Sequence, residues 1–163
     1  MIFEKIFRAF DQHGLKYAVI GGIAVNLHGY NRLTGNLDII ISLDDENISR
    51  FISITKSLGL VPRLPVKIED FANNDIRKSW ISEKNMAVFS VYNPSNPLEH
   101  VDVKIDGENN IESYLSNSEI VEADDIKIFL VSLDDLIKLK QEAGRERDLV
   151  DIRALERIKR LND

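Results

Sequence analysis

Residues 17–41 decide the fold, and they read YAVIGGIAVNLHGYNRLTGNLDIII. The first four residues are apolar and partly β-branched, which is typical of a short buried strand, and this strand stops at Gly21-Gly22. Residues 23–28 then follow the pattern of a helix, and residues 37–41 form a second buried strand. That strand contains Asp38, a carboxylate that a core strand would not choose for stability. Asp38 therefore needs a functional reason.

A double glycine between a strand and a helix lets an anion approach the backbone closely, and the free amides of the first helical turn favour phosphate. By itself, Gly21-Gly22 is more often a packing feature. The next strand adds a signal, because Asn36 and Asp38 alternate and so project from one face. Asp102, in a further predicted strand, offers another oxygen ligand. Such ligands beside a phosphate cradle suit Mg²⁺-dependent phosphoryl or nucleotidyl transfer, because the cation bridges carboxylates and phosphate oxygens.

Hydrophobic periodicity assigns most of the remaining chain. Helices are predicted over residues 2–13, 44–58, 111–115, 133–142 and 146–161, and strands over residues 86–92, 100–105 and 126–130. The segment 61–84 is harder to assign because Pro62 and Pro65 interrupt it, and both short helices and a mobile flap fit its pattern.

The composition predicts a single domain over residues 1–163. A chain of 163 residues with 44% hydrophobic content suits one core rather than two. No stretch approaches the ~18 apolar residues of a membrane span, and the first residues lack the order of a signal peptide. We therefore expect a cytoplasmic protein without a membrane partner.

Charge and cysteine content restrict the chemistry further. A formal net charge of −6 argues against non-specific coating of nucleic acid. The basic residues of positions 138–160 are interleaved with acids, and a solvated helix with ion pairs explains them better than a basic binding face. The absence of cysteine excludes thiolate zinc sites and cysteine nucleophiles. Any metal must then bind carboxylates, amides or histidines, which indicates Mg²⁺ or Mn²⁺.

Two blocks of the sequence resemble one superfamily. Gly21-Gly22, followed after thirteen residues by Asn36-Leu37-Asp38-Ile39, resembles the signature of nucleotidyltransferases of the DNA polymerase β-like type. The fuller run to Ile39 is similar to AbiEii-like and related small bacterial nucleotidyltransferases, and Lys140 with residues 143–151 resembles a later element of the same group. The resemblance implies an α/β (α+β) nucleotidyltransferase fold, with a mixed sheet flanked by helices.

The resemblance also implies an activity and its partners. An NTP would be the donor, two divalent metal ions would assist, and a nucleoside monophosphate would pass to a hydroxyl on RNA, protein or a small molecule. Proteins of this kind often act as toxins paired with an antitoxin protein, which is a further hypothesis from the resemblance.

The same resemblance assigns roles to particular residues. Asp38 would bind metal, and Asp102 would bind metal and activate the attacking hydroxyl. The residues expected to bind nucleotide are Gly21 and Gly22 at the triphosphate, Lys140 at phosphate, Arg145 and Asp148 along the site, and Arg32 and Thr34 either at phosphate or only as shapers of their loop.

Asn36 departs from the family pattern, because it stands at the position of the first acid and metal ligand. An amide keeps the shape of a carboxylate but loses the charge, so metal binding at Asn36, Asp38 and Asp102 should be weakened. Three explanations compete: an engineered Asp→Asn change, a natural change in a protein that only binds nucleotide, and a tolerated ligand in a weak enzyme.

Several other residues have structural explanations beside functional ones. Asp148 and Asp151 share a helix face, and a salt bridge with Arg145 or Arg147 explains them nearly as well as a site role. His100 is predicted to point to the face of its strand opposite Asp102 and to be structural.

Three further side chains are predicted to be mainly structural. His28 is expected to cap or pack its helix rather than to act in catalysis. Trp80 and Phe71 fit core packing better than stacking on a base. Two functions thus remain in view: a metal-dependent nucleotidyltransferase, and a non-catalytic nucleotide-binding or protein-interaction module of the same fold.

Overall fold

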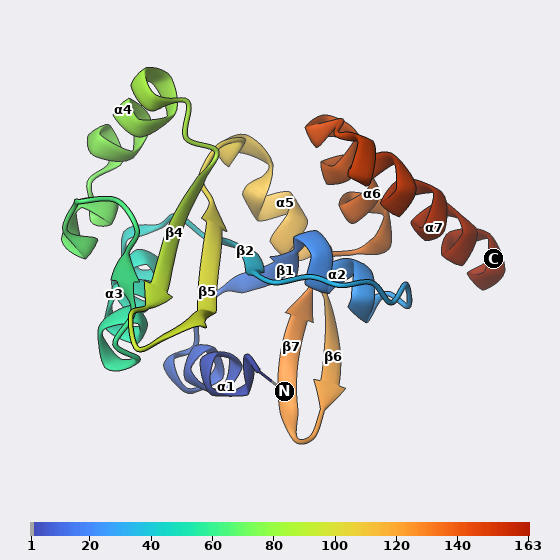
Figure 1. The fold of residues 1–163 in the computed structure, drawn as a ribbon, viewed down its shortest axis with the longest axis horizontal. Helices are drawn as coiled ribbons and strands as arrows, with labels where there is room; N and C mark the ends of the chain where they lie inside the picture. The colour runs from blue at the N-terminus through green and yellow to red at the C-terminus, as the bar shows by residue number, and fades with distance from the viewer. Residues whose placement is uncertain (1) are drawn as a thin grey trace.

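A seven-stranded mixed sheet forms the centre of the computed structural model, which describes residues 2–163 (Figure 1). The strands lie in the order β3-β4-β5-β2-β1-β7-β6. Pairs β2–β5 and β1–β7 are parallel, and the other neighbours are antiparallel. The strands are Tyr17–Ile20 (β1), Leu37–Ile41 (β2), Val61–Pro62 (β3), Val88–Asn93 (β4), Asn96–Lys104 (β5), Glu119–Ala123 (β6) and Ile126–Leu130 (β7).

Helices flank the sheet, as expected for this fold class (Figure 1). The α-helices are Glu4–His13 (α1), Gly21–Leu27 (α2), Asp45–Ser57 (α3), Asn74–Lys84 (α4), Ile111–Ser116 (α5), Leu133–Ala143 (α6) and Glu146–Asn162 (α7), and the 3-10 helices are Ile68–Ala72 (η1) and Glu108–Asn110 (η2). None of the helices in residues 2–163 has the length and apolar character needed to cross a membrane.

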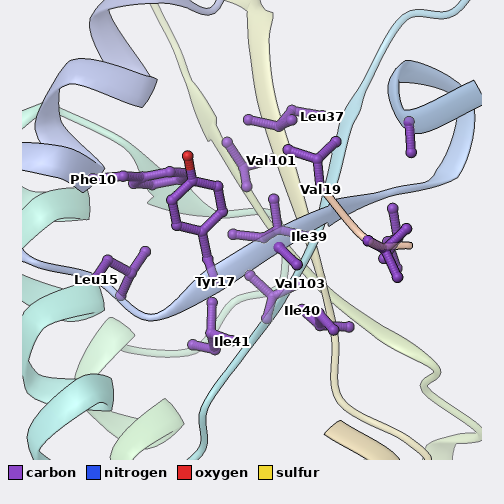
Figure 2. Packing of buried hydrophobic residues seen from close by; sticks show 14 of the residues in the cluster. Phe10, Leu15, Tyr17, Val19, Leu37, Ile39, Ile40, Ile41, Val101 and Val103 are labelled. Carbon is purple, nitrogen blue, oxygen red and sulfur yellow. The ribbon is translucent and has the colours of Figure 1, made fainter. Parts of the chain in front are cut away.

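One face of the sheet is apolar at its centre. Val19, Ile39 and Val103 are in register on neighbouring strands, and all three are buried. Figure 2 shows them with Tyr17, whose ring lies 4.8 Å from that of Phe10 on α1. This side of the sheet is closed by α1 and α3, which contact each other. Burial of β-branched side chains on this face supplies the hydrophobic driving force for the sheet.

The opposite face carries the carboxylates. Ile20, Asp38, Asp102 and Ser90 are in register across β1, β2, β5 and β4, so their side chains project from the same side. Helix α2 contacts β1, β2 and α6 on this side, and α6 packs against α7. The polar side chains of this row, those of Asp38, Asp102 and Ser90, therefore extend from the part of the sheet next to α2 and α6 to the β4–β5 hairpin.

The predicted strands and long helices are confirmed, with differences in extent. Helix α1 begins at Glu4 rather than at residue 2, and β4 begins at Val88 rather than at residue 86. Helix α2 begins at Gly21 rather than at residue 23, and β5 begins at Asn96, because only Pro94 and Ser95 turn between the hairpin strands. Strand β6 was not predicted. Its residues are largely exposed, so it lacks the continuous apolar run of a buried strand.

The segment that was hard to assign contributes to the core. It contains β3, η1 and α4, and its aromatic side chains Phe71 and Trp80 both pack against Phe89 of the sheet. Phe71 lies 4.9 Å from Phe89 between ring centroids, and Trp80 stacks on Phe89 at 5.2 Å. Phe71 and Trp80 are buried, so the prediction that they serve core packing is confirmed.

Candidate active site

Two carboxylates lie side by side on the polar face. Asp38 on β2 and Asp102 on β5 are directly in register on neighbouring parallel strands. Asn36 precedes β2 and reaches the same place, since its Nδ2 lies 3.3 Å from Asp102 Oδ2. The three residues expected to hold a metal are thus brought together from two segments of the chain.

The double glycine allows the backbone to pass these side chains closely. Gly21 has φ +68°, a left-handed conformation, and a Cβ on it would lie 2.2 Å from Asp38 Oδ2. A Cβ on Gly22 would lie 2.3 Å from Thr34 Oγ1. Both positions therefore require glycine for close approach, and Gly21 requires it for its backbone conformation as well.

A cavity of about 760 Å³ opens beside the acids. Its wall joins both sequence blocks of the resemblance, and contains Gly21, Gly22, Arg32, Thr34, Asn36, Asp38, Asp102, Lys140 and Arg145 among others. Asp148 does not line it, although it contacts two residues that do. Leu136, Leu139 and Ala143 of α6 give the cavity an apolar side.

Cationic side chains outnumber carboxylates along the cavity wall. The charged lining residues are five cations and two anions, namely Arg32, Lys104, Lys140, Arg145 and Arg147 against Asp38 and Asp102. Four of the cations form ion pairs with acids outside the lining, namely Arg32 with Asp151, Lys104 with Asp106, Lys140 with Asp148 and Asp151, and Arg145 with Asp148. Guanidinium and ammonium groups carry several donors each, so the wall can still offer hydrogen bonds to an anionic ligand.

Asp38 is the most perturbed acid of the site. Burial raises the pKa of its carboxyl group to about 7, and the charge of Asp102 and a hydrogen bond to it add to the increase, while Lys140 and Arg145 oppose it. Two carboxylates in one partly buried place repel each other, so one of them keeps a proton more readily. A cation between them would remove this repulsion.

Asp102 is held by its neighbours on the β4–β5 hairpin. Its Oδ1 accepts hydrogen bonds from Ser90 Oγ and from His100 Nε2, the latter at 2.8 Å. The prediction that His100 points away from Asp102 is wrong. Residues two apart in a strand share a face, because the side-chain period of a strand is two.

A buried ion-pair network joins the cavity to the C-terminal helix. Lys140 Nζ lies 2.9 Å from Asp151 and 3.3 Å from Asp148, and both acids are almost fully buried. Asp148 also forms an ion pair with Arg145, at 2.7 Å, which is the salt bridge that the structural explanation of Asp148 predicted. Asp151 instead accepts two hydrogen bonds from Arg32, both at 2.9 Å.

The network sets the charge state of its acids. Burial opposes the ionisation of Asp148, but hydrogen bonds from Arg145 and the charges of Lys140 and Arg145 outweigh it and lower its pKa. Burial likewise opposes the ionisation of Asp151, while hydrogen bonds from Arg32 and Lys140 lower its pKa below the usual value. Both acids are therefore ionised at neutral pH, and they neutralise most of the charge of Lys140.

His28 lies apart from this network and from the cavity. Its Nε2 is 2.8 Å from the carbonyl oxygen of Val131, and its side chain is buried at the end of α2. This contact ties α2 to the segment after β7, which is the kind of structural role expected for it.

Sequence reasoning missed three polar residues of the site, namely Ser90, Lys104 and Arg147. One signal could have revealed Lys104, because His100, Asp102 and Lys104 alternate along one strand and must share its face. Ser90 carried no such signal, since its pairing with Asp102 follows from the register of the hairpin.

Comparison with solved structures identifies the fold that carries this site. The lincosamide antibiotic adenylyltransferase LnuA, bound to lincomycin, superposes with a TM-score of 0.59 and 16% identity, covering 94% of this chain and 93% of that one. ANT(2")-Ia in complex with adenylyl-2"-tobramycin gives a TM-score of 0.59 and 16% identity over 98% and 92%. A nucleotidyltransferase-like protein from Paracoccidioides brasiliensis gives a TM-score of 0.59 and 15% identity over 98% and 74%.

These similarities show that the chain has the nucleotidyltransferase fold, as the sequence predicted. No protein-family model matches the sequence, and a search of curated proteins found no match. Membership of the AbiEii-like subgroup stays a prediction.

The residues present suit a divalent cation whose coordination is completed by a substrate. Among residues 2–163, no group of three His, Cys, Asp or Glu side chains is placed to hold a metal ion. Asp38 and Asp102 supply two carboxylates, and burial together with the charge of Asp102 raises the pKa of Asp38. Mg²⁺ commonly binds through one or two carboxylates together with substrate phosphates, so the pair fits this mode.

Proposed function

We propose that this protein is an Mg²⁺- or Mn²⁺-dependent nucleotidyltransferase, which moves a nucleoside monophosphate from an NTP to a hydroxyl group. The observation that carries the proposal is the pairing of Asp38 with Asp102 at the edge of a cavity lined by five cationic side chains. Carboxylates attract a cation, and the surrounding cations attract phosphate. A metal-bound triphosphate satisfies both requirements, whereas a neutral ligand satisfies neither.

The divalent cation would be held by Asp38 and Asp102, with Asn36 beside them, and would neutralise charge on the phosphates. Arg145, Arg147 and Lys104 face the same cavity and would bind the triphosphate oxygens. Lys140 would contribute less than the resemblance implies, because Asp148 and Asp151 already balance its charge.

Asp102 would act on the acceptor. The acceptor oxygen attacks the α-phosphorus and forms the new P–O bond, while the bond to the β-phosphate oxygen breaks and pyrophosphate leaves. The hydroxyl proton passes to the Asp102 carboxylate, which acts as general base. The acceptor is RNA, a protein or a small molecule, and the ligand-bound antibiotic-modifying neighbours make small molecules the first class to test.

Asn36 supports a second candidate, a module of the same fold that binds nucleotide or protein without catalysis. Its amide has no charge, and it donates toward Asp102 Oδ2 rather than offering an anionic ligand. An engineered inactivation, a natural loss of activity and a weak enzyme each agree with this arrangement. A cytoplasmic toxin held by an antitoxin protein is the biological setting we propose for the active form.

The deciding experiment is calorimetric titration of the protein with a non-hydrolysable NTP analogue, with and without Mg²⁺, compared with Asn36→Asp. We expect Mg²⁺-dependent binding that is tighter in Asn36→Asp, because the change restores a charged ligand. Glu122→Gln, an exposed change on β6, is the matched control and should behave as the unmodified chain. Absence of binding in both forms would exclude the transferase and favour the interaction module.

A further inference from the structure

One oxygen of Asp102 is fixed by side chains to which the proposed reaction assigns no role. Oδ1 accepts from both Ser90 and His100, whereas the amide of Asn36 contacts Oδ2 at the longer distance of 3.3 Å. We propose that His100 is a positioning residue of the transfer site. It donates its Nε2 proton to Oδ1 and so turns Oδ2 toward Asn36 and the cavity. This inference rests on the proposed function, because it assigns His100 to the same site.

Arg63 and Asp102 agree on which nitrogen of His100 carries the proton. Its Nη2 lies 3.2 Å from His100 Nδ1, and a guanidinium group has donors only. Nδ1 must therefore accept, which leaves the proton on Nε2, the atom that faces Asp102. The guanidinium also lies 4.9 Å from the ring centroid of Tyr92, the register partner of His100 on β4. The hairpin and the loop after β3 thus build a directed chain from Arg63 through His100 to Asp102.

Water cannot easily replace this donor. His100 is only 8% exposed, and it lies between Arg63 and Asp102. Partners that orient a metal ligand typically change metal affinity by about 10- to 100-fold when they are removed. An arrangement needed only for hairpin stability would not require a defined tautomer, and loss of its polarity would not change the affinity for metal and nucleotide.

The test compares His100→Leu with His100→Gln by calorimetry with Mg²⁺ and a non-hydrolysable ATP analogue. A Gln amide nitrogen can occupy the place of Nε2 and donate to Asp102, whereas Leu keeps bulk without a donor. We expect roughly 10- to 100-fold weaker binding for His100→Leu and near-normal binding for His100→Gln. His13→Leu, at the end of α1, is the histidine control and should leave binding unchanged. Thermal unfolding checks that each variant is folded.

A second readout does not depend on any His100 variant. Ring ¹⁵N NMR of the metal-free protein should show His100 as the Nε2–H tautomer, and Arg63→Leu should keep this tautomer because the Asp102 carboxylate still accepts from Nε2. An Nδ1–H tautomer in the unmodified protein would overturn the proposal, as would equal binding by His100→Leu and His100→Gln. If neither the unmodified protein nor Asn36→Asp binds the analogue with Mg²⁺, the proposed function itself fails, and if only Asn36→Asp binds, the His100 variants are compared in that background. If the parent chain binds and His100→Leu binds equally well, only the role of His100 fails.

Discussion

At the scale of single residues, the site combines a glycine in the left-handed conformation with an acid that is costly to ionise. Because Gly21 has no side chain, Asp38 can lie directly against its backbone. Burial and the neighbouring Asp102 raise the pKa of Asp38. Neither feature benefits the stability of the metal-free fold. Features of this kind concentrate at functional sites, where ligand binding offsets their cost.

Gly21→Ala should destabilise the protein more than a left-handed glycine elsewhere. Gly59 has a similar φ of +71°, but a Cβ there would meet nothing within 4 Å, which makes Gly59→Ala the matched control. We expect about 1 to 2 kcal/mol for the control, from backbone strain alone. Gly21→Ala should cost a further ~1 to 3 kcal/mol because its methyl group displaces Asp38. Urea unfolding measures both, and equal losses would show that the close contact with Asp38 is unimportant.

Asp38→Asn should stabilise the metal-free protein at pH 8. The folded pKa of about 7 exceeds the unfolded value of about 4, so the native state binds the extra proton and stability decreases as pH rises between these values. Above pH 7 the cost is complete, and the amide removes at least about 1 kcal/mol of it. The same change should abolish Mg²⁺-dependent nucleotide binding. A lower melting temperature than that of the unmodified chain at pH 8 would contradict this account.

At the scale of secondary-structure elements, the network of Lys140, Asp148 and Asp151 holds α6 to α7, and Arg32 adds the loop before β2. That loop carries Thr34 and Asn36 into the cavity. The position of Asn36 therefore depends on α7, a helix far away in the sequence. Buried ion pairs of this kind are costly to break, because one partner is left buried without compensation.

Asp151→Asn should therefore cost roughly 3 to 5 kcal/mol at pH 7, since Arg32 and Lys140 lose their shared acid. The folded pKa of Asp151 is lowered, so its contribution is present above about pH 4 and disappears as pH falls through the folded value. The difference between variant and parent should shrink accordingly at acid pH. Glu156→Gln, exposed on α7, is the control, and a pH-independent difference in denaturant midpoints would argue against the ion pairs.

At the scale of the whole molecule, five of the 21 Lys and Arg residues of an acidic chain line one cavity. The pair of Asp38 and Asp102 lies in the same wall, so one place offers partners for both a cation and a phosphate. Ligand affinity should then be coupled to global stability, because a ligand that binds only the folded state shifts the unfolding equilibrium.

A nucleotide with Mg²⁺ should raise the melting temperature in a concentration-dependent way. At 100 times Kd the stabilisation is about 2.7 kcal/mol, which corresponds to a shift of roughly 5 to 10 °C for a chain of this size. The same nucleotide with EDTA should give a smaller shift, since the acid pair then repels phosphate. Differential scanning fluorimetry measures both, and identical shifts would show that no metal links the nucleotide to Asp38 and Asp102.

The local elements and most of the residues proposed for the site could be predicted from the sequence. Strand–Gly-Gly–helix, the alternation of Asn36 with Asp38, and Asp102 in mid-strand all follow from period and residue type, which act within a few residues. The sequence also allowed the fold class to be predicted correctly through the two blocks of resemblance. Strand β6 escaped because an exposed edge strand has no buried pattern to recognise.

Which of these elements are neighbours depends on tertiary packing and could not be predicted from the sequence. The register of β2 with β5 places Asp38 against Asp102, and the packing of α6 on α7 joins Lys140 to acids that sequence spacing alone would pair with Arg145 or Arg147. The hairpin register adds Ser90, and the loop after β3 adds Arg63 to His100. Periodicity specifies the face on which a side chain lies, but its partner across the sheet depends on burial of the apolar surface of the whole chain.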